Sequence, residues 1–181
     1  MIDTSNLHAF MEEKYLQFNA TTFIDEDPIS VVHQFSKKQD IEIIGLWIAT
    51  IAWGNRKSII NSGNKIVELM DGSPYDFILN HKPKDRQRFK DFKHRTFQYD
   101  DSLYFLDFFQ HYYTNHHSLE SLFATSIQNE DSIEKGLIHF RSTFFQRNEH
   151  LKRTEKHVAS PLRGSTCKRL CMFLRIINVL K

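Results

Sequence analysis

Glycine, proline and cysteine are scarce in this chain of 181 residues, which contains six Gly, four Pro and two Cys. β-Sandwiches need frequent turns rich in Gly and Pro, so this shortage argues against them. Two Cys cannot form the disulfide framework of a small secreted domain. Sixteen Phe and six Tyr instead predict long helices packed around an aromatic core. We therefore expect an all-α fold with one helical domain over residues 1–181.

Several sequence features of other protein classes are also missing. A membrane-spanning helix needs about 20 consecutive apolar residues, and no run here is that long. Residues 1–14, MIDTSNLHAFMEEK, have neither the basic start nor the apolar segment of an export signal, so we expect a cytoplasmic protein without a membrane partner. The phosphate loop GxxxxGK, the GxSxG elbow and the GxGxxG turn are absent, which argues against nucleotide hydrolysis and serine esterase chemistry. We expect no cofactor.

Two groups of potential metal ligands are better explained by packing or exposure. His111, His116 and His117 do not have the spacing of a helical zinc signature, and no carboxylate stands between them at the position that a metalloprotease needs. Cys167 and Cys171 are four residues apart on an expected helix, so we expect both to face the same packing surface. The sequence therefore predicts no metal site.

The most apolar stretch, IEIIGLWIATIAW from Ile41 to Trp53, predicts the central helix of the fold. Its apolar residues surround the helical cylinder, as expected of a buried helix, and Asp40 stands at the N-cap position. A buried strand is the alternative, because Ile and Trp favour strands, although the run is long for a strand. An N-terminal amphipathic helix is expected around Leu7, Phe10, Met11 and Tyr15. Further helices are expected over residues 28–35, 59–70, 75–80, 103–113, 118–123 and 133–145. The charged residues 81–94 predict a loop or a solvated helix.

Charge is divided unevenly along the chain. Residues 141–181 carry ten Lys or Arg and two Glu, a net of +8, whereas residues 1–140 carry fourteen basic and twenty acidic groups, a net of −6. Clustered cations favour polyanions, because phosphate contacts release counterions. A polyanion-binding surface and an ordinary solvated helix face are both compatible with this pattern.

The segment SPLRGSTCKR, residues 160–169, opens the last expected helix, and residues 160–181 form a hairpin-like unit. A tight turn containing Gly164 precedes a helix that begins near Lys168 and Arg169. Backbone N–H groups at a helix start can bind a phosphate, and adjacent cations strengthen that binding. Phosphate binding and simple helix capping remain alternatives for this turn.

The same segment resembles the hairpin of the helix-hairpin-helix DNA glycosylases, in which a Leu-Pro-Gly-Val-Gly-x-Lys turn grips the DNA backbone. Leu162 matches the Leu, Gly164 the first Gly, and Lys168 the Lys that is the nucleophile of the bifunctional members. The central helix and the following GNRKSII are similar to the apolar helix and polar wedge of that family. Nearly the whole chain more closely resembles an uncharacterised bacterial family of conserved hypothetical proteins, domain of unknown function 2400, related to these glycosylases.

The resemblance implies a multi-helix orthogonal bundle like part of such a glycosylase. It also implies a DNA glycosylase or lyase of base-excision repair, with DNA as the partner and Lys168 as the catalytic residue. It implies that the DNA is contacted by Asn55, Arg56, Lys57, Arg163, Gly164, Ser165 and Arg169. In this mechanism Lys168 is a desolvated amine that attacks the sugar C1′ of a flipped, damaged nucleotide and forms a Schiff base.

The sequence departs from the glycosylase pattern in three places. Arg163 replaces the Pro, and Thr166 replaces the second Gly, which adds a Cβ where the backbone would approach a phosphate. Residues 150–160 are polar, which puts the first helix of the pair in doubt. The chain also ends before the essential Asp of a Val/Leu-Asp-x-His motif, and without this Asp base excision should be weak or absent, because such groups are worth factors of about 10² to 10⁴.

The last residues, INVLK, contain no helix stop signal. We therefore expect a C-terminally shortened product, whose exposed helix faces would favour self-association.

Two other functions remain open besides the enzyme. One is a non-catalytic nucleic-acid-binding domain that uses the same basic end, with Lys168 contacting phosphate or facing solvent. The other is a helical protein-interaction domain without affinity for nucleic acid.

Overall fold

The computed structural model describes residues 4–18, 24–124, 132–147 and 150–179, and within these ranges it contains helices and no strand. The all-α prediction is confirmed. None of the described helices is both long and apolar enough to cross a bilayer.

The α-helices are α1 (Thr4–Phe18), α2 (Ile29–Val32), α3 (Lys38–Ile51), α4 (Arg56–Leu69), α5 (Pro74–Asn80), α6 (Tyr99–Asn115), α7 (Glu120–Ala124), α8 (Glu134–Phe144) and α9 (Lys168–Val179). The 3₁₀ helices are η2 (Asp85–Phe89), η3 (Lys152–His157) and η4 (Pro161–Arg163).

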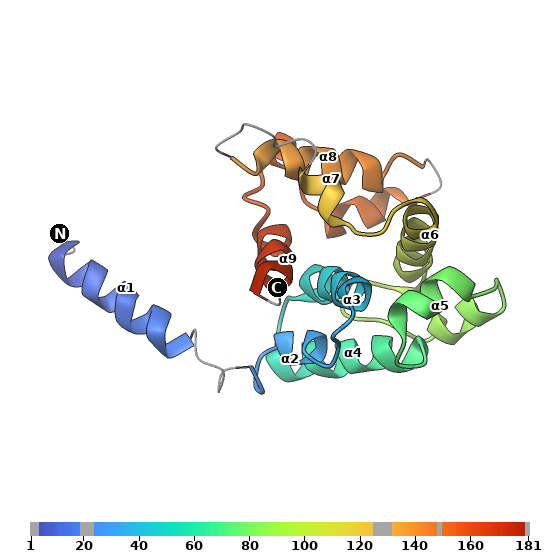
Figure 1. Cartoon of the computed structure of the whole chain (residues 1–181), viewed down its shortest axis with the longest axis horizontal. Helices are drawn as coiled ribbons and strands as arrows, with labels where there is room; N and C mark the ends of the chain where they lie inside the picture. Colours follow the sequence, from blue (N-terminus) through green and yellow to red (C-terminus); the bar gives the residue numbers. More distant parts are fainter. Residues whose placement is uncertain (1–3, 19–23, 125–131, 148–149, 180–181) are drawn as a thin grey trace.

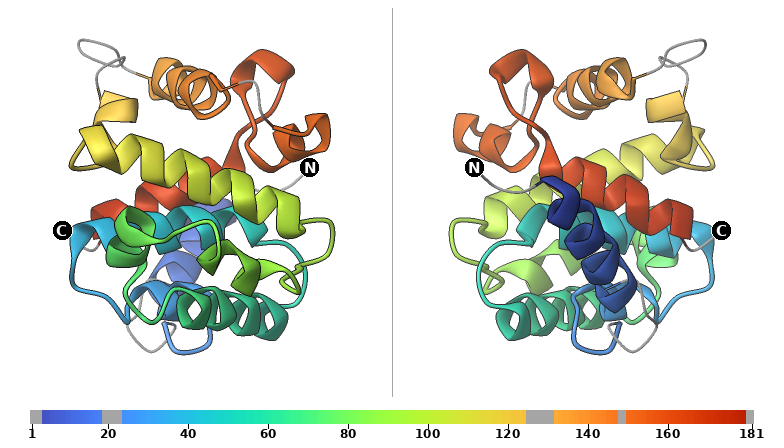
Figure 2. Two further views of the ribbon diagram at one scale, coloured as in Figure 1. Left: turned by 90° about the vertical axis from the view of Figure 1, so that its right-hand side faces the viewer. Right: turned by 90° about the vertical axis from the view of Figure 1, so that its left-hand side faces the viewer.

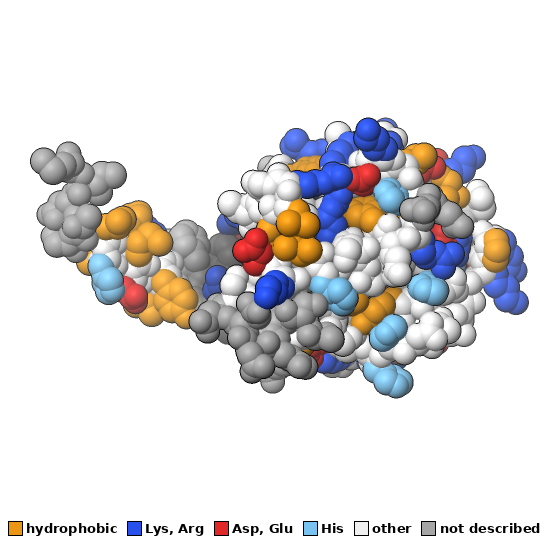
Figure 3. All heavy atoms as spheres, turned by 90° about the horizontal axis from the view of Figure 1, so that it is seen from above, with side chains coloured by type: hydrophobic (Ala, Val, Ile, Leu, Met, Phe, Trp, Pro, Cys, Tyr) orange, Lys and Arg blue, Asp and Glu red, His pale blue; other side chains and the backbone are white. Residues whose placement is uncertain are grey.

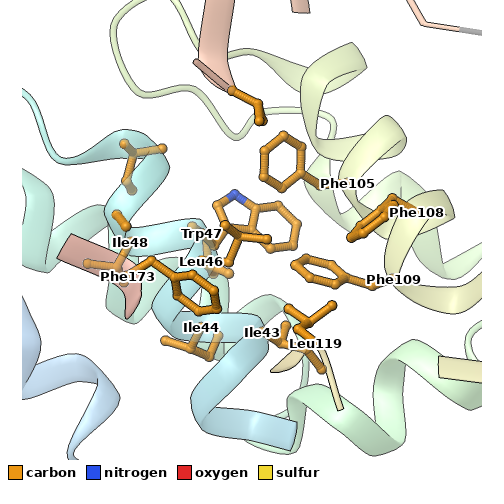
Figure 4. Close-up of a cluster of buried hydrophobic side chains, with 14 of the residues drawn as sticks. Ile43, Ile44, Leu46, Trp47, Ile48, Phe105, Phe108, Phe109, Leu119 and Phe173 are labelled. Atoms are coloured by element: carbon orange, nitrogen blue, oxygen red, sulfur yellow. The ribbon is translucent and has the colours of Figure 1, made fainter. Parts of the chain in front are cut away.

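Helix α3 lies at the centre of the fold (Figure 1), with α2 and α4 on one side of it, α5 and α6 on another, and α9 packed along it. Figure 2 shows α7 and α8 as a further layer beyond α6 and α9. Residues 41–51 of α3 are all buried, as the apolar pattern predicts. Trp47 is completely buried, and the rings of Phe89, Phe105 and Phe109 lie within 6.0 Å of it (Figure 4). An aromatic core around α3 therefore organises the other helices.

The prediction that Asp40 caps α3 is wrong. Lys37 is the N-cap, and α3 begins at Lys38 and ends at Ile51 instead of Trp53. The Asp40 carboxylate accepts a hydrogen bond from the backbone N–H of Tyr75 at 2.7 Å. It therefore caps the first turn of α5, where unpaired N–H groups favour a negative charge.

The charged segment over residues 81–94 is more than a solvated loop. It contains the short helix η2, and Phe89 and Phe92 are buried in the core beside the buried rings of His81 and His94. Nε2 of His81 accepts a hydrogen bond from Nε of Arg86 at 3.0 Å. Burial lowers the pKa of His81, and the adjacent Arg86 lowers it further, so this ring favours the neutral form.

The apolar face of α9 is buried in its described part, including Leu170, Phe173 and Ile176. The expected shortening of the chain stays a prediction. Exposed apolar side chains are instead concentrated on α1, which stands apart from the other helices (Figure 1). They are Leu7, Phe10, Met11, Tyr15 and Leu16. Self-association stays a prediction.

The two cysteines do not share a packing surface. Cys167 precedes α9 with φ of +51° and is buried, whereas Cys171 lies on α9 and is exposed. The expected helical spacing fails because Cys167 is outside the helix. No three His, Cys, Asp or Glu side chains of the described residues are grouped so as to hold a metal ion.

Candidate nucleic-acid interface

Arg169 joins the end of α3 to the start of α9. Its Nη1 donates a hydrogen bond to the carbonyl oxygen of Thr50 at 2.6 Å, and its guanidinium lies 4.8 Å from the centre of the Trp53 ring. Thr50 is in the last turn of α3, where carbonyl groups lack helical partners and favour a cation. Burial lowers the pKa of Arg169, which nevertheless remains charged. Arg169 therefore clamps the end of α3 to the start of α9, and its expected contact with DNA stays a prediction.

This clamp brings together two segments that the sequence analysis selected separately. Asn55 ends the turn between α3 and α4, Arg56 is the first residue of α4, and Arg169 immediately follows Lys168. The two segments are more than 100 residues apart in the chain but meet at Trp53. They therefore lie at one end of the central helix.

Gly54 shapes the turn between α3 and α4. It has φ of +104°, a conformation that residues with a Cβ rarely adopt. A Cβ at this position would lie 2.5 Å from Nη2 of Arg95, so the guanidinium of Arg95 covers the glycine backbone. Arg95 is exposed and adds a cation to this turn. Arg95 could not be selected from the sequence, because nothing in its charged segment indicates a contact with Gly54.

Asn55 has a clear structural role. It is the N-cap of α4, and its side-chain oxygen accepts a hydrogen bond from the backbone N–H of Ser58 at 3.4 Å. Lys57 is exposed in the first turn of α4 and lines an open hollow of about 680 Å³. The other polar side chains of this hollow include Ser58, Asn61, Ser62, Lys65, Arg88, Asp91 and Lys93. The hollow extends a cationic surface along α4.

The hairpin-like segment has only part of the expected geometry. Gly164 is left-handed, with φ of +69°, and ends η4, so the expected tight turn is present. Residues 152–157 form the 3₁₀ helix η3 instead of the first α-helix of a pair. Arg163 forms an ion pair with Glu155 at 2.5 Å, and Ser165 Oγ accepts a hydrogen bond from the backbone N–H of Cys167 at 3.1 Å. Both side chains therefore have partners within the protein.

Lys168 is the first residue of α9 and is exposed to solvent. Its amine is therefore in contact with water in the free protein, whereas the expected mechanism has the amine desolvated by burial. The structure therefore contradicts the expected burial of Lys168. An exposed cation at a helix start is suited to contact a phosphate.

A buried polar cluster lies behind the Trp53 ring. The Asp101 carboxylate is completely buried, forms an ion pair with Arg153 at 2.6 Å, and accepts a hydrogen bond from the Thr154 hydroxyl at 2.7 Å. Nε2 of His157 is 3.4 Å from Oδ2 of Asp101, and the His157 ring packs against Trp53 with the ring centres 5.6 Å apart and the planes tilted by 36°. Neither ring nitrogen of His157 has a hydrogen-bond partner that meets standard geometry among the described residues.

Burial raises the pKa of Asp101, but close contacts with His157, Thr154 and the backbone N–H of Gln98 outweigh burial and hold that pKa below its ordinary value. Asp101 is thus a buried anion that joins α6 to η3 beneath the candidate interface. The Gln98-x-x-Asp101 capping box marks this position in the sequence, although its contacts with η3 could not be inferred.

The basic end of the chain is only partly available for binding. Arg141 and Arg163 both pair with Glu155, and Arg153 pairs with Asp101. The exposed cations gathered around the Trp53 turn come from four different segments. We call them the basic face: Arg56, Lys57, Arg95, Lys156 and Lys168. Lys156 belongs to it because its carbonyl oxygen accepts a hydrogen bond from Arg169 at 3.4 Å.

The fold and this surface define an all-α protein with a basic face at one end of its central helix. Residues 27–177 match the family described as "Protein of unknown function (DUF2400)", and the chain belongs to this family. The match confirms the resemblance to an uncharacterised family. No curated protein and no solved structure matches the chain. The relationship to the DNA glycosylases stays a prediction.

Proposed function

We propose that this protein binds nucleic acid through the basic face. The observation that carries the proposal is the Arg169 clamp, which holds the α3–α4 turn against the start of α9 and so joins cations from distant segments. Phosphates condense counterions, and clustered exposed Lys and Arg release them on binding.

The hollow along α4 supports the same function. Its cationic side chains Lys57 and Lys93 stand beside the hydroxyl groups of Ser58 and Ser62, and such groups commonly contact phosphate and sugar oxygens. The contacts expected from these residue types fix the position of a nucleic acid and do not read its bases. We therefore expect binding with little sequence preference.

Fluorescence anisotropy with a labelled 20-base-pair duplex tests the proposal. The double variant Lys57→Gln/Lys168→Gln removes two charges from the basic face and should weaken binding roughly 10- to 50-fold at about 0.1 M salt. The control Lys82→Gln/Lys84→Gln removes the same charge from the exposed loop after α5 and should change affinity less than about twofold. Equal losses in both variants would show a net-charge effect and would refute the assignment to this face.

A second candidate, a lyase acting on damaged DNA, depends on the accessibility of the Lys168 amine. Because the amine is exposed at the edge of the basic face, a sugar aldehyde bound there could reach it. Borohydride trapping on a duplex with an abasic site tests this chemistry without the need for base removal. An adduct that is lost in Lys168→Gln would establish the lyase. Binding without an adduct supports the non-catalytic function, and absence of binding would leave a protein-interaction domain.

A further inference from the structure

A second hollow lies away from the basic face, between α6 and α8, and has a volume of about 540 Å³. Its floor is aromatic, formed by Phe108, Tyr112 and Phe144, and its edge carries His111, His116 and His139. Figure 3 shows histidine side chains gathered around hydrophobic atoms on this side of the molecule. The volume is within the range of small-ligand pockets, about 300 to 1,000 Å³.

The floor consists of buried rings, and the ring of His116 is stacked on that of Tyr112 with the centres 4.2 Å apart. The rings of Phe108 and Phe144 lie 4.4 Å apart, and both side chains are almost completely buried. The Tyr112 hydroxyl shares a hydrogen bond with Ser121 Oγ at 2.7 Å. A ligand that enters the hollow therefore meets aromatic carbon atoms at its base, which favours a planar aromatic ring.

The edge carries imidazoles whose orientation is fixed by backbone carbonyls. Nδ1 of His116 lies 3.0 Å from the carbonyl oxygen of Tyr112, and Nδ1 of His139 lies 2.9 Å from that of Leu122. Because a carbonyl only accepts hydrogen bonds, Nδ1 carries the proton in both rings. Nε2 of each ring has no partner among the described residues and remains available to a ligand.

The charges around the hollow favour an acidic ligand. Its one carboxylate among the lining residues, Asp107, is already paired with Arg86 at 2.5 Å. An imidazolium group at this edge can pair with an anion, whereas no unpaired lining carboxylate opposes it.

We propose that the hollow between α6 and α8 binds a planar aromatic ring that carries an acidic group, either a phosphate or a carboxylate. The ring lies above the aromatic floor, and the acidic group lies among His111, His116 and His139. The residues of the site are separate from the basic face, so this inference does not depend on nucleic-acid binding.

Proton NMR of the histidine rings tests the proposal, with signals assigned from single His→Gln variants. Four probes are added in turn: adenosine 5′-monophosphate, 2-naphthoate, adenosine and inorganic phosphate. At least one aromatic anion should shift the His111, His116 and His139 signals to a plateau. The concentration of this anion that gives half of the shift should be at least tenfold lower than that of adenosine or inorganic phosphate. Which anion binds distinguishes a phosphate source from a carboxylate source. Equal binding of inorganic phosphate, or no shift with either aromatic anion, overturns the proposal.

Two variants locate the binding site. His111→Gln changes an exposed side chain on α6, and His139→Gln changes a half-buried one on α8; each should weaken binding of the active probe about fivefold or more. His33→Gln, on the exposed end of α2, is the matched control and should leave affinity unchanged. Loss with His33→Gln, or no loss with His111→Gln, would place the probe elsewhere and overturn the proposal.

Discussion

The Arg169 clamp can be tested by its contribution to stability. In Arg169→Met the carbonyl of Thr50 loses a charged donor at 2.6 Å, and Trp53 loses the guanidinium that lies on its ring. A hydrogen bond to a charged group contributes about 1.5 to 3 kcal/mol, and a cation–π contact contributes about 0.5 to 2 kcal/mol. One side chain makes both contacts, so these contributions are not simply additive. We expect the free energy of unfolding to fall by about 2 to 4 kcal/mol.

Urea unfolding followed by tryptophan fluorescence measures this change. With a slope of about 2 kcal/mol/M, the midpoint should fall by roughly 1 to 2 M. Lys168→Met is the matched control, because it removes the adjacent cation of the same helix from an exposed position. It should change the free energy of unfolding by less than about 0.5 kcal/mol. A loss below about 0.5 kcal/mol for Arg169→Met, or equal losses in both variants, would refute the clamp.

Three further changes test other parts of the structure. Gly54→Ala should destabilise the protein by about 1 to 3 kcal/mol in thermal unfolding, and Gly164→Ala should destabilise it less. The reason is that φ of +104° at Gly54 is more strained for alanine than φ of +69° in the open left-handed turn at Gly164. Glu42→Gln should lower the free energy of unfolding by about 2 to 4 kcal/mol in the same assay, because the completely buried carboxylate accepts three hydrogen bonds, including one from Tyr113 at 2.7 Å. A decrease of less than about 1 kcal/mol would contradict this prediction. Asp101 has a depressed pKa, so its contribution to stability is present above the unfolded-state pKa of about 3.9 and is lost as pH falls through the folded-state pKa. Urea midpoints from pH 7 to pH 3 should therefore fall more steeply for wild type than for Asp101→Asn, and parallel curves would exclude this linkage.

The elements with strong sequence patterns were predicted well. The apolar run from Ile41 identified α3, and the periodic residues between Ile133 and Phe145 identified α8 within one residue at each end. Hydrophobic periodicity reports which residues are buried, and burial dominates the stability of a helix. Helix ends depend on single polar contacts, so they were less reliable. Asp40 is an example, because its partner, the backbone of Tyr75, comes from another helix.

The candidate interface could be predicted only in parts. The sequence selected Lys57 and Lys168, which are exposed on the two segments that the Arg169 clamp joins. It also assigned Arg163 and Arg169 to DNA, although both have partners within the protein. The partners could not be inferred, since Thr50 lies 119 residues before Arg169 in the chain. Arg95 was missed for the same reason. Contacts between distant segments depend on the packed fold, and local spacing does not encode them.

The central claim is that the basic face binds phosphates, and the salt dependence of binding tests it most directly. The affinity of wild type for a labelled duplex is measured by anisotropy from about 50 to 200 mM salt and compared with that of Lys57→Gln/Lys168→Gln. If both lysines contact phosphates, the slope of log affinity against log salt should become less steep by about 2 in the double variant. An unchanged slope, or no binding by wild type at 50 mM salt, would contradict the claim.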